Sequence, residues 1–166
     1  MFLKLVENLR EAMQVRTLRN SCREYLTNNR DYIGIPQQLR WYFGYYCPAR
    51  RTARYRLYVL LSKERSPLGY GALALRDEKL FVTECVGPGH RGEGYGRIIL
   101  RYLTKIAARE QRDLVAEIWV SNNPSIALHE REGFTLRSRS FQSGSELYRY
   151  ELDWRALVKT LPLIDS

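Results

Sequence analysis

The chain has 166 residues, of which 45% are hydrophobic and 27% charged, and its formal net charge is +9. This length and composition suit one globular domain with a full core, so we expect a single domain over residues 1–166. No apolar run approaches the roughly 20 residues of a membrane helix. The first seven residues make a poor signal peptide, so a cytoplasmic protein with no membrane partner is expected.

The positive charge is concentrated in the first third of the chain. Residues 1–56 hold 11 Lys and Arg against 4 Asp and Glu. Such a surface can attract acidic partners, or it can be ordinary solvated surface. Because no recognised reader motif accompanies the charge, nucleic acid is not an expected partner. The three cysteines cannot all pair and show no zinc spacing, so we expect free thiols and no metal site.

The first part of the chain reads as a strand followed by two helices. Residues 1–7 are expected to form a first strand. Over residues 8–26 the apolar side chains recur at three- and four-residue steps, which predicts a helix. A second helix should begin near Pro36, because the N–H that proline lacks is not needed in a first turn. Its inward face is expected to carry Leu39, Phe43 and Tyr46.

A meander of three strands comes next. Residues 54–61 alternate, and a turn at Ser66 and Pro67 leads to a second strand over residues 69–75. A tight turn then leads to a third strand over residues 79–86.

After this meander the chain returns to helices and strands in alternation. A glycine-rich loop is followed by an apolar stripe from Ile99 to Ala107, which predicts a long helix. Residues 113–120 form an apolar strand, which should run parallel to strand 79–86 because a helical crossover separates the two. The remaining elements are a helix from Asn122 to Gly133 and strands over residues 134–141 and 146–152. Together the elements predict an α/β fold with one mixed sheet.

The segment after strand 79–86 is suited to binding an anion. Gly92, Gly94 and Gly96 leave backbone N–H groups uncovered, and the following helix adds free N–H groups and the positive end of its dipole. A nucleotide P-loop needs Lys and then Ser or Thr after its last glycine, but an Arg-Ile pair stands here. A dinucleotide fold needs an acidic residue at the end of the next strand, which is missing. The pattern therefore indicates an anion site of another kind.

Two motifs carry a resemblance to a known family. The acyl-CoA signature of the GNAT superfamily of N-acetyltransferases is similar to Val86-x-Pro88-x-x-Arg91-Gly-x-Gly94-x-Gly96. The second motif of that superfamily resembles Asn122-Asn-Pro-Ser125-Ile-Ala-Leu-His129-Glu-Arg-Glu-Gly133-Phe134. The resemblance implies the GNAT fold, a single mixed sheet of about seven strands with helices on both faces. In that fold the sheet is splayed between the fourth and fifth strands, and the fourth strand carries a bulge.

The resemblance also implies a donor substrate, acetyl-CoA, and no metal. The pyrophosphate would lie on the N–H groups of the glycine loop, where a Cβ would block its approach. The pantetheine arm would lie in the gap beside the preceding strand. The thioester carbonyl would point at the Val86 N–H, worth about 3 kcal/mol of oxyanion stabilisation. The expected donor-binding residues are Cys85, Val86, Arg91, Gly92, Glu93, Gly94, Tyr95, Gly96, Arg97, Asn122 and Ser125.

Two residues are candidates for proton transfer. Glu84 is the candidate catalytic base, because a carboxylate between Val82 and Val86 on one strand face is unusual without a task or a partner. A salt bridge to an arginine would explain it equally, and Glu117 or a base acting through water are alternatives. His129 stands where most superfamily members carry Tyr. It is the candidate catalytic acid for the CoA thiolate, or a side chain that only packs against the donor.

The acceptor should be bound by the first two helices and the loop between them. Arg19 and Asn20 belong to a pattern similar to GNAT members that acetylate nucleotide-linked amino sugars, although they can equally brace the helices. The expected reaction is direct transfer of acetyl to a primary amine of a small molecule, such as an amino sugar or a nucleotide-linked amino sugar. A protein or peptide N-acetyltransferase and a non-catalytic CoA-binding module are alternatives, and a homodimer is left open. The expected acceptor residues are Asn29, Arg30, Tyr32, Trp41 and Glu117.

Overall fold

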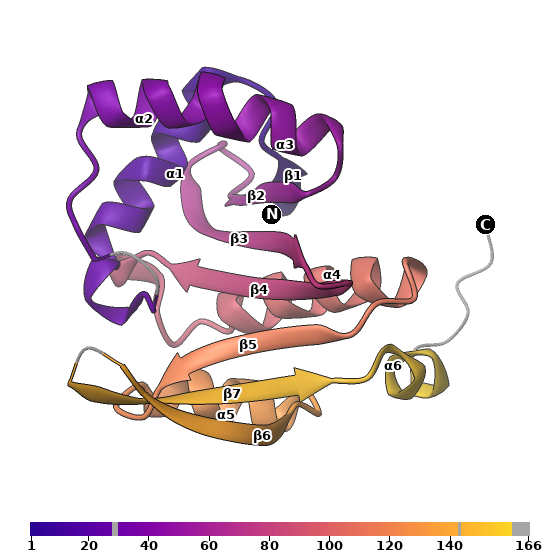
Figure 1. The fold of residues 1–166 in the computed structure, drawn as a ribbon. Helices are drawn as coiled ribbons and strands as arrows, with labels where there is room; N and C mark the ends of the chain where they lie inside the picture. The colour runs from indigo at the N-terminus through magenta and orange to yellow at the C-terminus, as the bar shows by residue number, and fades with distance from the viewer. Residues whose placement is uncertain (28–29, 143, 161–166) are drawn as a thin grey trace.

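A computed structural model of the chain describes residues 1–27, 30–142 and 144–160. Seven strands form one mixed sheet in the order β1-β2-β3-β4-β5-β7-β6 (Figure 1). The strands are β1 (Phe2–Leu5), β2 (Tyr55–Leu61), β3 (Pro67–Arg76), β4 (Lys79–Val86), β5 (Leu114–Trp119), β6 (Thr135–Gln142) and β7 (Ser145–Leu152).

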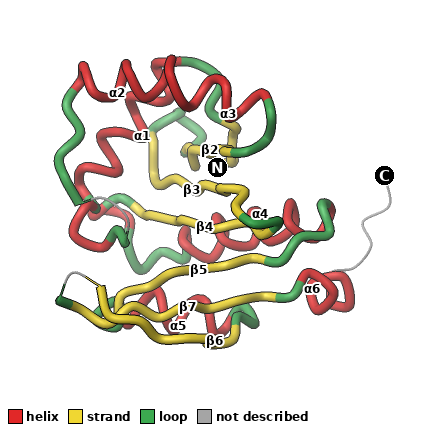
Figure 2. Tube along the Cα trace, viewed as in Figure 1, coloured by secondary structure: helices red, strands yellow, loops and turns green. Residues whose placement is uncertain are grey.

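Helices cover both faces of this sheet, and Figure 2 separates them from the strands by colour. The α-helices are α1 (Leu9–Ser21), α2 (Ile35–Trp41), α3 (Cys47–Arg51), α4 (Tyr95–Arg109), α5 (Asn123–Arg131) and α6 (Trp154–Thr160). Shorter helical turns are η1 (Arg23–Tyr25), η2 (Tyr42–Tyr46) and η3 (Pro88–His90). Among the described residues, no helix is long and apolar enough to cross a membrane.

The sheet opens between its fourth and fifth strands. As expected, β4 and β5 run parallel, but they pair only through Leu80 with Leu114 and Phe81 with Val115. Beyond these pairs the two strands diverge toward the left of Figure 1. The expected bulge in β4 is not present, since β4 keeps an unbroken register with β3 from Lys79 to Val86. The gap therefore forms because β5 turns away, while β4 stays fully paired on its other side.

Each face of the sheet has its own apolar core. On one face, α1 and η2 pack on β2, β3 and the end of β4, burying residues such as Val15, Tyr46 and Tyr70. On the opposite face, α4 packs on β3, β4 and β5 through residues such as Leu103 and Ile118. We call these the α1 face and the α4 face. Alternation along each strand sends neighbouring side chains to opposite faces, so both faces draw on the same strands.

The second helix is in part different from its prediction. Phe43 was expected to face inward, but its side chain is 63% exposed, while Tyr42 and Tyr46 are buried. The helix passes from α2 into the π-helical turn η2 before α3. A π turn carries more residues than an α turn, so the inward face moves by one position from the one that an unbroken 3.6-residue period predicts.

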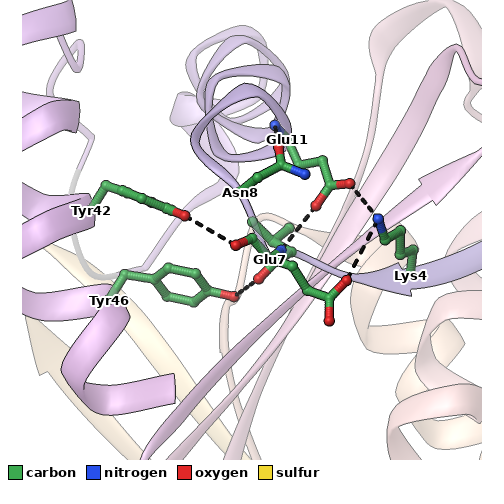
Figure 3. Close-up of polar contacts among 7 residues, drawn as sticks. Lys4, Glu7, Asn8, Glu11, Tyr42 and Tyr46 are labelled. Carbon is green, nitrogen blue, oxygen red and sulfur yellow. Dashed lines mark hydrogen bonds and ion pairs between the residues drawn. The ribbon is translucent and has the colours of Figure 1, made fainter. Parts of the chain in front are cut away.

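A polar network ties the start of α1 to β1 and to η2 (Figure 3). Asn8 caps α1 by accepting a hydrogen bond from the Glu11 N–H, at 3.0 Å. The Glu11 carboxylate accepts hydrogen bonds from the Lys4 ammonium, at 2.6 Å, and from the Glu7 N–H, at 2.9 Å. The Tyr46 hydroxyl donates a hydrogen bond to the Val6 carbonyl, between β1 and α1, at 2.5 Å. Because these bonds satisfy groups that folding removes from water, they hold the α1 face in one arrangement.

Candidate active site

The glycine loop presents uncovered N–H groups at the start of α4. Gly92 and Gly94 have φ angles of +82° and +81°, a left-handed conformation that glycine adopts without strain. Gly94 is the residue before α4 and provides no side-chain cap. A Cβ added at Gly92 or Gly94 would meet nothing within 4 Å, so the space above the loop is open. Unpaired N–H groups, the helix dipole and open space together form an anion site.

The end of β4 directs backbone N–H groups into the gap. The Leu80 N–H donates toward β5, to the Asp113 carbonyl at 2.9 Å, and the Gly87 N–H donates toward β3, to the Leu68 carbonyl at 2.9 Å. Because N–H groups alternate sides along a strand, the Val86 N–H points into the gap. An extended chain lying there could pair with β4 as an added strand would.

A helix terminus fixes the ring of His129. Gly133, with φ +92°, ends α5 in a left-handed conformation, as the sequence predicted. The Gly133 N–H donates to the Glu130 carbonyl and the Phe134 N–H to the His129 carbonyl, which is the Schellman pattern. The Phe134 ring then packs edge-on against His129, with ring centroids 4.8 Å apart. The His129 Nδ1–H donates to the Ser125 carbonyl at 2.8 Å, because a carbonyl can only accept.

Glu84 faces this histidine across the α4 face. Its Oε2 lies 3.6 Å from His129 Nε2, and its Oε1 accepts a hydrogen bond from Ser125 Oγ at 3.3 Å. His129 is 1% exposed, and its Nε2 has no hydrogen-bond partner among the described residues. The ionisable group that faces the Glu84 carboxylate is therefore the His129 ring, and no arginine forms an ion pair with Glu84 among the described residues. With the ring proton on Nδ1, a neutral Nε2 turns a lone pair toward the carboxylate, so the pair has room for one more proton.

One cleft of about 970 Å³ passes through the sheet at the gap. Its α4-face half contains the glycine loop, Glu84 and the first turns of α4 and α5. Its α1-face half contains residues after α1 and the facing side chains of β2, β3, β4 and β5. Described residues of this second half include Cys22, Tyr25, Leu26, Thr27, Tyr55, Ala74, Arg76, Phe81, Thr83, Cys85 and Glu117. A donor and an acceptor can thus reach the same gap from opposite faces.

The residues predicted for the donor are brought together, with one exception. All of them line the cleft apart from Glu93, whose carboxylate instead lies 3.8 Å from His90 Nδ1. The Arg97 guanidinium lies at the rim and donates to Glu132 at 2.6 Å. The Arg91 guanidinium turns inward, over the Tyr25 ring at 4.6 Å. Asn122 caps α5 by accepting the Ser125 N–H at 3.4 Å.

The residues predicted for the acceptor are more dispersed. Glu117 lines the cleft, whereas Arg30, Tyr32 and Trp41 do not, and Asn29 lies outside the described residues. The Arg30 guanidinium lies 4.7 Å from the centroid of the Trp119 ring, and Tyr32 is exposed. The Trp41 ring packs edge-on against the ring of Tyr55, at 6.1 Å, and Tyr55 does line the cleft.

Arg19 and Asn20 hold the segment between α1 and α2. The Arg19 guanidinium donates to the Asp31 carbonyl. The Asn20 amide donates to the Ile33 carbonyl and accepts the Ile33 N–H, both at 3.0 Å. These bonds support the bracing alternative for the two residues.

The cleft residues that sequence reasoning did not single out include Cys22, Tyr55, Arg76 and Phe81. A period-two pattern placed Tyr55 and Phe81 on strands, and Arg76 was expected in the turn after strand 69–75. Only the pairing of the strands shows that the three share a cleft.

Cys22 lies at the junction of the two halves. Its thiol donates to the Val86 carbonyl at 3.3 Å, and the Arg91 guanidinium lies 3.6 Å from its sulfur. A hydrogen bond from Cys85, with others from Ser21 and Arg91, outweighs burial and lowers the pKa of Cys22 to about 6. The same contact, with burial, raises the pKa of the Cys85 thiol far above its usual range. The described residues contain no cluster of His, Cys, Asp and Glu that could hold a metal ion.

A splayed mixed sheet, a glycine loop at a helix N-terminus and a cleft through the gap are the features that the resemblance to acyl-CoA-dependent acyltransferases implies. The family model for the acetyltransferase (GNAT) family matches residues 13–134. The chain therefore belongs to the GNAT family, whose members transfer acetyl from acetyl-CoA. A comparison with curated proteins found no significant match.

Solved structures confirm the fold. The Salmonella typhimurium protein yncA, in complex with acetyl-CoA, has a TM-score of 0.77 at 23% identity, covering 93% of this chain and 94% of that one. Spermidine N-acetyltransferase from Vibrio cholerae, in complex with CoA and spermine, has a TM-score of 0.81 at 14% identity, covering 95% and 97%. Ribosomal-protein-alanine N-acetyltransferase from Brucella melitensis has a TM-score of 0.77 at 21% identity, covering 92% and 99%.

Proposed function

We propose that this enzyme transfers acetyl from acetyl-CoA to a primary amine of a small molecule, such as an amino sugar or a nucleotide-linked amino sugar. The observation that carries the proposal is the cleft through the sheet. Its α4-face half holds the glycine loop, its α1-face half is lined by side chains of β2, β3, β4 and β5, and the two halves meet at the gap between β4 and β5. Direct transfer needs both reactants at one point, since holding them there removes much of the entropic barrier.

On the donor side, the pyrophosphate would bind the N–H groups at the start of α4, and the pantetheine arm would lie along β4. The Val86 N–H would then donate to the thioester oxygen. A fixed donor aimed at the oxyanion would lower the barrier by about 3 kcal/mol. Arg97 at the rim would add positive charge when its guanidinium leaves the Glu132 carboxylate and pairs with a phosphate of the donor instead.

The Glu84 and His129 pair would handle the proton. The attacking amine must be neutral, and it gives up a proton as the new amide bond forms. Glu84 can accept that proton, directly or through a water, and His129 Nε2 lies 3.6 Å further on. The C–S bond then breaks, and the departing CoA thiolate can take a proton from the same pair. No covalent intermediate on the enzyme is needed.

The test is release of the CoA thiol from acetyl-CoA over a panel of amino sugars, aminoglycosides, polyamines, amino acids and peptides. We expect turnover with amino sugars, and mass spectrometry should find the product 42 Da heavier, roughly the mass of one acetyl group in place of one hydrogen atom on nitrogen. Turnover with peptides alone would replace the small-molecule acceptor by a protein acceptor. Acetyl-CoA binding without turnover on any amine would contradict the proposed activity.

A further inference from the structure

The α1-face half of the cleft contains a row of three residues on neighbouring strands. Tyr55 on β2 pairs with Ala74 on β3, and Ala74 pairs with Phe81 on β4. All three line the cleft, so a methyl group lies between two aromatic side chains. Directly paired side chains on one sheet face stand about 5 Å apart. The row therefore forms a shallow recess with aromatic walls at the end of the cleft far from the glycine loop.

Positive charge gathers at this recess. The Arg76 guanidinium lies 4.9 Å from the centroid of the Phe81 ring, and the Arg149 guanidinium lies 5.4 Å from it. Arg149 is neutralised by Glu151, which also pairs with Lys79. Arg76 has no ion-pair partner in the part of the chain that is described, and it lines the cleft.

Tyr55 adds a neutral hydrogen-bond donor to the recess. Burial raises its pKa to about 12, so the hydroxyl keeps its proton at neutral pH. The Trp41 and Tyr45 rings pack against it, at centroid distances of 6.1 Å and 5.9 Å, and hold it in place. Trp41 therefore supports this recess from behind. A cation, a phenol that donates and a shallow floor suit a group with several negatively charged oxygens.

We propose that the recess formed by Tyr55, Ala74, Arg76 and Phe81 binds an anionic group, a phosphate or a carboxylate, carried by the acceptor amine. This inference rests on the proposed N-acetyltransferase function. Along β4, the step from Val86 to Phe81 is five residues, or roughly 17 Å at 3.4 Å per residue. The long Arg76 side chain can cover part of this distance, so the anionic group would be separated from the reacting nitrogen by several bonds of the acceptor.

Glu117 lies between these two places. It follows Val115, the partner of Phe81, by two residues on β5 and shares its face. Its register partner on β7 is Arg149. The Arg91 guanidinium reaches the α1-face half near Cys22 and Tyr25, and Glu117 and Arg76 are the charged side chains in the rest of its described lining. A ligand that has a positive or hydroxyl-bearing part and a distant anionic part would complement both.

The test compares acetyl transfer to glucosamine, glucosamine 6-phosphate, UDP-glucosamine, glutamate and spermidine. We expect kcat/KM for the best phosphate-bearing amine to exceed that for glucosamine by about tenfold to a hundredfold, because a charge-assisted contact is gained. Comparing the two phosphate-bearing amines with glutamate shows whether the recess binds a phosphate or a carboxylate. The two phosphate amines differ in the distance from nitrogen to phosphorus.

The decisive variant is Arg76→Gln, with Arg137→Gln as its matched control on the exposed strand β6, where Arg137 forms no ion pair with any residue that the structure describes. Arg76→Gln should raise KM for the anionic amine about tenfold and leave that for glucosamine unchanged, and the control should change neither. Ala74→Phe should close the recess with the same selectivity. An equal loss on every acceptor, or a preference for spermidine or glucosamine in the unmodified enzyme, would overturn the proposal. Should none of the five amines be acetylated, the proposed function fails along with it.

Discussion

His129 Nε2 and Glu84 Oε2 face each other at 3.6 Å between α5 and β4, with no hydrogen bond to Nε2 among the described residues. The Nδ1–H of the same ring is committed to the Ser125 carbonyl. Nε2 and Oε2 are then both hydrogen-bond acceptors, so one proton can be bound between them. Such a pair is suited to receive a proton from an amine and return it to a thiolate.

Replacing Glu84 by Gln should remove the proton acceptor without disturbing the fold. The Gln amide can donate to His129 Nε2, so the free energy of unfolding should not fall. We expect kcat to drop by roughly 10² to 10⁴, the usual contribution of a positioned acid or base. Steady-state kinetics across the pH range measure this, with Glu64→Gln in the β2–β3 turn as the control. Full kcat in the Gln variant at every pH would show that Glu84 is not the base.

Gly94→Val should weaken acetyl-CoA binding. The φ of +81° is unfavourable for valine by roughly 1–2 kcal/mol, and its side chain would stand over the N–H groups at the start of α4. We expect the Kd for acetyl-CoA, measured by calorimetry, to rise at least about tenfold, since phosphate contacts carry much of the binding. Gly89→Ala is the control, because Gly89 lies in the same loop, has open space and lacks a positive φ. Unchanged affinity in Gly94→Val would refute the phosphate-loop assignment.

Cys22 should react as a thiolate at neutral pH. Its pKa of about 6 is below the ordinary value of 9.0, so the thiolate predominates above pH 6 and the thiol below it. The rate of alkylation by iodoacetamide should fall about tenfold from pH 7 to pH 5, because the thiolate is the nucleophile. Mass spectrometry of the modified peptide identifies the site, and CoA should protect it, since Cys22 lines the cleft. A midpoint near pH 9 would contradict the pairing with Cys85 and Arg91.

Glu11→Gln should destabilise the protein at neutral pH. Burial alone would raise the pKa of Glu11, but hydrogen bonds from the Glu7 N–H and the Lys4 ammonium lower it below 4.5. A lowered pKa in the folded state contributes stability above the ordinary value, and this is lost as pH falls through the folded value. We expect a loss of about 1–3 kcal/mol at pH 7 that shrinks in acid. Urea denaturation at both pH values measures it.

The control for Glu11 is its neighbour. The Glu7 carboxylate is mostly exposed and lies 3.6 Å from the same lysine ammonium. An exposed ion pair contributes about 0–1 kcal/mol, so Glu7→Gln should have little effect at either pH. Equal losses in the two variants would mean that the hydrogen bonds of Glu11 add nothing to the fold.

Most of the elements could be predicted because each depends on a local period. The parallel pairing of β4 and β5 followed from the crossover helix, and Gly133 marked the end of α5. The prediction that Phe43 faces inward was wrong, because a regular apolar period does not reveal a π turn. The prediction of a bulge in β4 was wrong for a different reason, because strand pairing depends on residues far away in the sequence.

The sequence by itself determined the glycine loop that we propose as the donor site of this enzyme. Gly92, Gly94 and Gly96 stand next to one another in the chain, and the helix they precede needs only its own backbone to present free N–H groups. Only the tertiary structure decided which side chains meet across the gap. Glu84 and His129 are 45 positions apart in the numbering and come together because β4 and α5 pack on the same face. The recess of Tyr55, Ala74 and Phe81 depends in the same way on the register of three strands, which no local pattern contains.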